Sequence, residues 1–340
     1  MTLWKLLDCG LKLRLPLLVI SVNTPVVLFA YSRPEHTLRV LNSLLGNPEA
    51  ALTDLVVYLD GPRNEPDRIA GDSISEMVTN LTGFRSVKLI QAEKNKGLAN
   101  SIVDGVTEQL MEHESVIVME DDIEVAPTFL RYMNDALDLY MTEEKVASIH
   151  AHVYPVNLEL PETFFVRGAD CWGWGTWRRA WQHFETDGQV LLERLESRGL
   201  CREFDFNGSA EFTQMLKDQI SGKNDSWAVR WHASTFLQDM VTLYPRSTQA
   251  INIGQDGGGS HRGVGILDSR GFDSQPVSVV WQAPEPLSIA HAAFEEFFLS
   301  QRPLFARTRL GLAIFRAMQR GSRVIPDSVR VRLVGYIRNN

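Results

Sequence analysis

Cysteine is scarce in this chain of 340 residues, which contains only Cys9, Cys171 and Cys201. The three are widely spaced and no two form a Cys-Xaa-Xaa-Cys pair. This pattern excludes a disulfide framework and gives no support to a zinc site. Few, unpaired cysteines are typical of reducing compartments, so a cytoplasmic location is expected.

An uninterrupted apolar run of membrane-spanning length is also missing. The apolar-rich residues 11–30 are broken by charged residues, prolines and an asparagine: Lys12, Arg14, Pro16, Asn23 and Pro25. A spanning helix needs about 20 consecutive, predominantly apolar residues. No small-residue cleavage site marks a signal peptide either. Residues 1–24 are therefore predicted to form an N-terminal extension.

Positive charge is too sparse overall for generic nucleic-acid binding, because the formal net charge is -8. It is concentrated instead in residues 302–338, which hold nine arginines, no lysine and one acid, Asp327. Apolar residues alternate with these arginines, a pattern expected of a basic amphipathic helix on an anionic membrane surface. The predicted location is then peripheral, on the inner face of the cell membrane. A helix that packs on the acidic body is the alternative.

Short apolar runs alternate with amphipathic helical patterns through the first 150 residues. The runs at 26–30, 55–59, 87–90 and 115–119 predict buried strands. Strands that alternate with helices indicate βαβ units. The predicted fold class is therefore α/β, with a mixed, mainly parallel sheet flanked by helices.

Three consecutive carboxylates, Glu120, Asp121 and Asp122, follow the fourth predicted strand. Unpaired carboxylates are too costly to bury, so the triplet must leave the core where the strand ends. Ligands of open α/β sheets bind at the carboxyl ends of the strands. Adjacent carboxylates there suit Mg²⁺ or Mn²⁺ holding phosphate oxygens. A solvated acidic turn is the alternative.

Other polar residues follow the first three predicted strands. Arg33 lies in the turn Tyr31-Ser32-Arg33-Pro34, before a predicted helix whose N-terminus suits an anion. Taken as an isolated residue, it is interpreted as a surface arginine. Asp60 ends the second strand, and Lys96 lies in the segment Asn95-Lys96-Gly97 after the third.

The composition changes after about residue 150, and six of the eight tryptophans lie in residues 172–231. Alternating tryptophan and glycine, as in Trp172-Gly173-Trp174, can form a flat stacking wall that a sugar approaches closely. A tryptophan-rich core is the alternative. Residues 253–261 are too rich in glycine for regular structure and end at His261, for which a linker with an exposed histidine is the alternative.

Together these features resemble nucleotide-sugar glycosyltransferases of the GT-A fold. The Ser-Arg-Pro turn, Leu-Asp-Gly, Asn-Lys-Gly-Leu-Ala and the acidic strand end are similar to family 2 glycosyltransferases. The run Val118–Pro127 is similar to animal N-acetylglucosaminyltransferase I. The likeness covers roughly residues 26–262. It implies a nucleotide-sugar-binding half (residues 25–150), an acceptor-binding and catalytic half (residues 151–265) and a basic, helical C-terminal extension (residues 266–340).

The resemblance also implies roles for individual residues. Asp122 matches the metal-contacting aspartate, and Glu120 and Asp121 match positions that face the donor sugar and the ribose. Asp225 matches the catalytic base of an Asp-Xaa-Trp context, although Asn224 stands where the animal enzymes have tryptophan. His261 resembles a late histidine that completes the metal shell in some GT-A enzymes. The remaining expected donor-binding residues are Arg33, near the nucleotide; Asp60, at the base; and Lys96, Gly173 and Trp174.

The expected activity is metal-dependent, inverting transfer of a sugar, foremost from a UDP-sugar, to a glycan or lipid-linked acceptor during polysaccharide or glycan assembly. Mn²⁺ or Mg²⁺ is the implied cofactor. One alternative is a sugar-phosphate nucleotidyltransferase, but that class usually has a glycine-rich loop where this chain has Tyr31–Pro34. A non-catalytic carbohydrate-binding protein is the other alternative. It would need the aromatic wall but neither the triplet nor Asp60.

Overall fold

The computed structural model describes residues 23–254, 271–272 and 275–302. Its main sheet consists of β1 (Val26–Ala30), β2 (Asp54–Leu59), β3 (Ser86–Gln91), β4 (Ser115–Glu120), β6 (Val146–His150), β7 (Thr163–Arg167), β8 (Trp174–Trp177) and β9 (Val241–Pro245). The strand order is β3-β2-β1-β4-β8-β6-β9-β7. Only β8 and β7 run antiparallel to their neighbours, so the predicted mixed, mainly parallel sheet is confirmed.

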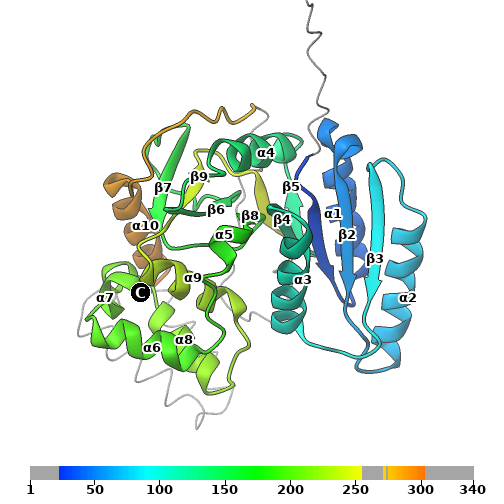
Figure 1. Cartoon of the computed structure of the whole chain (residues 1–340), viewed down its shortest axis with the longest axis horizontal. Helices are drawn as coiled ribbons and strands as arrows, with labels where there is room; N and C mark the ends of the chain where they lie inside the picture. The colour runs from blue at the N-terminus through cyan, green and yellow to red at the C-terminus, as the bar shows by residue number, and fades with distance from the viewer. Residues whose placement is uncertain (1–22, 255–270, 273–274, 303–340) are drawn as a thin grey trace, which may run out of the picture.

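Helices flank this sheet, as predicted. They are α1 (Pro34–Leu45), η1 (Pro48–Leu52), α2 (Glu65–Thr79), α3 (Leu98–Glu112), α4 (Phe129–Leu139), α5 (Arg178–Trp181), α6 (Gly188–Ser197), α7 (Cys201–Phe204), η2 (Phe206–Gly208), α8 (Phe212–Ile220), α9 (Trp227–Leu237) and α10 (Ser288–Ser300). Figure 1 shows β3 and α2 at one end of the sheet and β7 and α10 at the other. A small antiparallel pair, β5 (Ile123–Val125) and β10 (Ala250–Asn252), follows the end of β4.

Local sequence explains where these elements begin. The strand β1 is a continuous apolar run whose five residues are all buried, as expected for a central strand covered on both faces. Proline occupies the first turn of α1 and of α2, where its missing N–H leaves no hydrogen bond unmade. The side chains of Asn64 and Ser226 cap α2 and α9 by accepting from backbone N–H groups.

The tryptophans after residue 150 lie mainly in the core. Trp174 and Trp177, on the central strand β8, are each 1% exposed. The indole of Trp174 stacks on that of Trp227 with ring centroids 5.4 Å apart, and Trp181 and Trp231 pack beside it. Trp172 alone of the six is half-buried. The tryptophan-rich core is therefore the interpretation that holds for the other five.

The two predicted halves contribute to one sheet, because β4 of the first pairs with β8 of the second. The first 22 residues of the predicted N-terminal extension, and all of the basic tail from residue 303 on, lie outside the described residues. Of the helices that the structure describes, none combines the length and apolar content needed to cross a membrane.

Candidate functional site

Polar side chains gather at one edge of the sheet. The strands β1, β2, β3, β4 and β6 run in the same direction, so their carboxyl ends share this edge. The predicted residues that follow these strands are Arg33, Asp60, Lys96 and the triplet Glu120–Asp122. Parallel topology thus brings residues from four separate segments to one edge, where α/β sheets bind ligands.

An ion pair connects the turn after β1 with the end of β4. Arg33 Nη1 lies 3.1 Å from Asp122 Oδ2, and the two side chains are 23% and 20% exposed. The backbone N–H of Tyr31 donates to Asp121 Oδ2 at 3.2 Å. The turn after β1 therefore supplies one cation and one N–H donor to the triplet.

The triplet carries more negative charge than these contacts neutralise. Burial, followed by the charge of Asp122, raises the pKa of Asp121 to about 7. Burial and the charges of Asp122 and Asp121 raise the pKa of Glu120 well above its ordinary value. Burial also raises the pKa of Asp122, although Arg33 opposes the rise. An additional positive charge would stabilise the ionised form of crowded, partly desolvated carboxylates of this kind.

A divalent cation fits the chemistry of this donor set. Within the described chain, no three histidine, cysteine or carboxylate side chains converge on a single position that could hold a metal ion. Mg²⁺-type sites, however, are commonly built from one or two carboxylates, water and the phosphates of the substrate. Asp122 would supply the protein ligand. His261, the other predicted ligand, lies outside the described residues.

Gly254 lies against the ion pair. Ile253 N donates to the backbone oxygen of Asp122 at 2.8 Å, which holds this segment over the triplet. A Cβ on Gly254 would lie 2.9 Å from Arg33 Nη1 and closer still to Asp122 Oδ2. Real Cβ atoms do not approach other atoms this closely, so the site requires glycine here.

Asp60 has a different environment from the one expected for a base-reading aspartate. Its carboxylate accepts from the backbone N–H groups of Gly61, Lys96 and Gly97 and from Asn95 Nδ2, at 2.8–3.0 Å. An ionised carboxylate has about four lone-pair sites. All four sites are therefore occupied, three of them by donors of the loop after β3, and a nucleobase would have to displace one of these donors.

Lys96 belongs to this loop, and Asp225 lies against it. The Lys96 ammonium is 3.2 Å from Asp104 Oδ2, in a pair whose side chains are both more than half exposed. Asp225 is exposed and immediately precedes Ser226, the N-cap of α9. Its Oδ2 lies 3.7 Å from the position that a Cβ on Gly97 would take. Asp225 thus faces the loop that Asp60 holds, at the same edge as the triplet.

Gly173 and Trp174 lie where packing is tight. Gly173 has a φ of +62°, and a Cβ there would be 3.0 Å from Ala250 Cβ of β10. Since Trp174 is buried in the core, its side chain does not form part of an exposed wall. Only Trp172 of the predicted wall is accessible to a ligand.

Sequence reasoning missed two groups at this edge. The Arg63 guanidinium lies over the ring of Tyr31, 5.4 Å from its centroid, and Arg63 Nε donates to Asn95 Oδ1 at 3.0 Å. The other group is His150 and Asp170, whose Nε2 and Oδ1 atoms are 4.0 Å apart and which lie beside Cys171 at the start of the segment that leads into β8. The position of His150 at the end of a buried strand was a usable signal, and Arg63 offered none.

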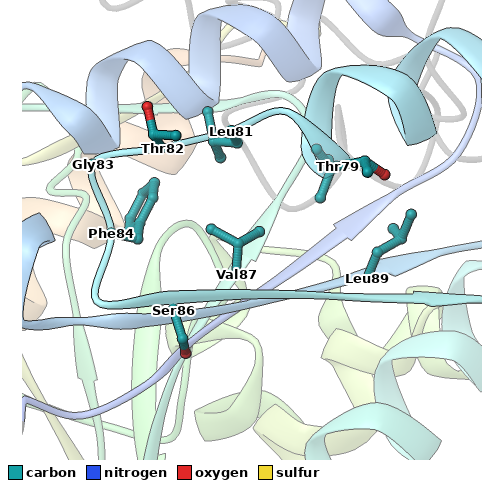
Figure 2. Close-up of a pocket in the computed structure, with 9 residues that line it drawn as sticks. Thr79, Leu81, Thr82, Gly83, Phe84, Ser86, Val87 and Leu89 are labelled. Carbon is teal, nitrogen blue, oxygen red and sulfur yellow. The ribbon is translucent and has the colours of Figure 1, made fainter.

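A separate hollow of about 480 Å³ lies along the outer strand β3 and contains no predicted site residue. Figure 2 shows Leu81, Phe84 and Val87 gathered around it, with Ser86 pointing to the opposite side of the strand. It is lined by ordinary apolar and hydroxyl side chains and offers no convergent charged group. We therefore place the candidate site at the carboxyl edge and not in this hollow.

No family model and no curated protein matches this chain. Among solved structures, Staphylococcus aureus TarS is 19% identical, with a TM-score of 0.29 over 43% of this chain and 24% of that one. TarS 1–349 in complex with UDP is 19% identical, with a TM-score of 0.29 over 41% of this chain and 38% of that one. The mannosyltransferase PcManGT from Pyrobaculum calidifontis, in complex with GDP-Man and Mn²⁺, gives 13% identity and 0.30 over 52% and 47%. This chain covers less than half the length of each, so fold and function rest on its own residues.

Proposed function

We propose that this protein is a metal-dependent glycosyltransferase of the GT-A type that uses a nucleotide-diphosphate sugar. The supporting observation is the Arg33–Asp122 pair at the carboxyl edge, next to two further carboxylates whose pKa values are raised. A site that combines an arginine, a helix N-terminus and clustered acids suits a diphosphate accompanied by a divalent cation.

In this proposal the nucleotide lies over the ends of β1, β2 and β3. Arg33 and the N-terminus of α1 face the diphosphate, and Asp122 is the protein ligand of Mn²⁺ or Mg²⁺. The stacked Tyr31 and Arg63 offer a flat surface for the base. Asp60 acts by holding the loop that contains Lys96, which follows from the three donors that this loop supplies.

Transfer then proceeds as a single displacement. The acceptor hydroxyl oxygen forms a bond to the anomeric carbon as the bond from that carbon to the diphosphate breaks, with inversion. The bonding electrons leave with the diphosphate, and Asp225 takes the hydroxyl proton as general base. When bound, the cation stabilises the negative charge that develops on the leaving diphosphate.

Two substitutions separate these roles. Asp122→Ala is expected to abolish metal-dependent nucleotide binding, whereas Asp225→Asn should leave binding unchanged and remove turnover. The assay is release of nucleoside diphosphate from a panel of nucleotide sugars with Mn²⁺ and with EDTA. Near-normal turnover by Asp225→Asn would refute the assignment of the base. Release that is insensitive to EDTA and to Asp122→Ala would refute metal dependence.

UDP as the nucleotide, a glycan or lipid-linked acceptor, and membrane contact through the arginine-rich tail are further parts of this proposal. The tail carries nine arginines and one acid between residues 302 and 338. Deletion of residues 302–340 should move the protein from the membrane fraction to the soluble fraction on cell lysis. Unchanged partitioning after that deletion would rule out the tail as the membrane contact.

A further inference from the structure

The segment that contains Asp170 and Cys171 adjoins the acidic triplet, about 50 residues away in sequence. The residues that lead into β8 lie between the ends of β4 and β6, because β8 pairs with both strands. Ala151 N donates to Gly173 O at 2.9 Å, which extends this pairing to the sheet edge. After burial and the charge of Asp170, the charges of Glu120 and Asp122 contribute to raising the pKa of Cys171. The Asp170–Cys171 segment is therefore a neighbour of the triplet.

The Asp170 carboxylate is held in a fixed orientation. Its Oδ2 accepts from the Tyr154 hydroxyl at 2.8 Å, and its Oδ1 accepts from Cys171 N at 2.9 Å. The Tyr244 hydroxyl faces it too. Two hydrogen-bond donors and a nearby hydroxyl, against about four lone-pair sites, leave acceptor capacity for a ligand. The side chain remains 23% exposed, so a ligand can reach it.

The environment keeps this carboxylate ionised. Burial by itself would raise the pKa of Asp170, but His150, the Tyr154 hydroxyl and Cys171 N together lower it below the ordinary value. A carboxylate with a lowered pKa is a poor proton acceptor at neutral pH and a good acceptor of hydrogen bonds from hydroxyl groups.

Two tyrosines, Tyr154 and Tyr244, lie against Asp170, and further aromatic rings pack around its neighbours. Tyr154 is fixed by rings of α10, with its centroid 4.9 Å from that of Phe294 and 5.1 Å from that of Phe297. The half-buried Trp172 contacts the ring of His152 at 4.8 Å. Aromatic side chains next to a few well-placed polar groups are suited to a polyhydroxylated ring.

We infer that Asp170 binds the sugar that is transferred, accepting hydrogen bonds from its hydroxyl groups, and that Tyr154 is the positioning residue that orients it. The inference rests on the proposed function and deepens it. If the nucleotide lies over β1–β3 and the diphosphate at Asp122, the sugar extends toward β8 and β6, where Asp170 lies. Because Asp170 and the triplet are acidic, the donor is a neutral sugar, and a uronic acid is rejected by charge repulsion.

Calorimetric titration with Mn²⁺ tests this with UDP, UDP-glucose, UDP-galactose, UDP-N-acetylglucosamine and UDP-glucuronic acid. In the wild type, the best neutral donor should bind at least about tenfold tighter than UDP-glucuronic acid. Asp170→Asn should weaken that donor about tenfold, the effect of losing one charge-assisted hydrogen bond, and should leave UDP within about twofold. Asp170→Asn should also narrow the difference in affinity between the best neutral donor and UDP-glucuronic acid.

Tyr154→Phe is the second variant, since it keeps the ring and removes only the hydroxyl that orients Asp170. It should weaken the neutral donor in the same direction by a smaller factor, with UDP unchanged. Asp72→Asn, on the exposed face of α2, is the control for removing an aspartate and should change no affinity. If both site variants lose UDP and UDP-sugar affinity equally, or if neither variant loses affinity, the role of Asp170 is overturned but the proposed function is not. Failure of the wild type to bind any of the five ligands would overturn the proposed function and this inference with it.

Discussion

Replacing Gly254 with alanine tests whether the Arg33–Asp122 pair is the centre of the site. The new Cβ would lie 2.9 Å from both Arg33 Nη1 and Asp122 Cβ, and nearer still to Asp122 Oδ2. Ordinary carbon contacts are about 3.5–4.0 Å, so the Asp122 carboxylate must move by about 1 Å or more. Ile253 N donates a hydrogen bond to Asp122 O, which limits how far the backbone of Gly254 can move away.

A displacement of that size should be far more harmful to turnover than to folding. Misplacement of a catalytic group by about 1 Å can cost about 100-fold in rate. The ion pair is partly exposed, so its loss should lower the free energy of unfolding by no more than about 1 kcal/mol. We therefore expect Gly254→Ala to reduce metal-dependent release of nucleoside diphosphate by about 100-fold while the protein remains folded.

The assay is steady-state release of nucleoside diphosphate with Mn²⁺, alongside denaturant unfolding. Gly71→Ala is the matched control: it is a helical glycine of α2 with no atom within 4 Å of the added Cβ. It should keep full activity and gain up to about 1 kcal/mol of stability. Wild-type activity in Gly254→Ala would show that the position of Asp122 does not matter, which would refute the reasoning.

Three further predictions concern stability. Trp231 Nε1 is buried without a hydrogen-bond partner in the described chain, whereas Trp177 Nε1 donates to a backbone carbonyl at 3.1 Å. Trp177→Phe should therefore lower the free energy of unfolding by about 1–2 kcal/mol more than Trp231→Phe does. Equal effects of the two variants in denaturant unfolding would contradict this. Burial lowers the pKa of His232 from 6.5 to about 4 in the folded protein. As pH falls from 6.5 toward 4, the imidazole is therefore protonated in the unfolded chain but not in the folded one, and stability is lost. His232 alone should contribute about 2 kcal/mol to the loss of stability between pH 7 and 5, so His232→Asn should remove that part of the pH dependence; an unchanged pH dependence in that variant would refute the assignment. Asp60→Asn should set an amide donor against backbone N–H groups and speed hydrogen exchange at Gly97, and unaltered exchange there would contradict the anchoring role of Asp60.

The strands and the edge where they end were predictable because their signals are local. A buried parallel strand is a continuous apolar run, and charged residues directly after it must leave the core. Those two rules are sufficient to bring Arg33, Asp60 and the triplet to one edge.

The burial of the tryptophans in the core was not predictable in the same way. The pattern Trp174-Gly175-Thr176-Trp177 fits an exposed ridge as well as a central strand, and the choice depends on the strand order. Here β8 lies between β4 and β6, so both of its faces are covered and its tryptophans become core. Strand order arises from non-local pairing, which a local pattern does not contain.

The environments of Asp60 and Asp170 were beyond sequence reasoning for a related reason. Asp60 was predicted at the correct edge, but three of its four donors come from the loop at residues 95–97. The orientation of Asp170 depends on Tyr154, which is itself held by α10 more than 100 residues later. A side chain's position can follow from its own segment, whereas its partners follow from the whole fold.

The central claim is that Asp122 and a divalent cation together hold a nucleotide diphosphate at this edge. Calorimetric titration of UDP into the wild type and into Asp122→Ala, each with Mn²⁺ and with EDTA, tests it most directly. The account predicts binding only in the wild type with Mn²⁺, and loss of that binding in both EDTA and the variant. Equal UDP binding with and without Mn²⁺, or UDP binding that survives in Asp122→Ala, would contradict it.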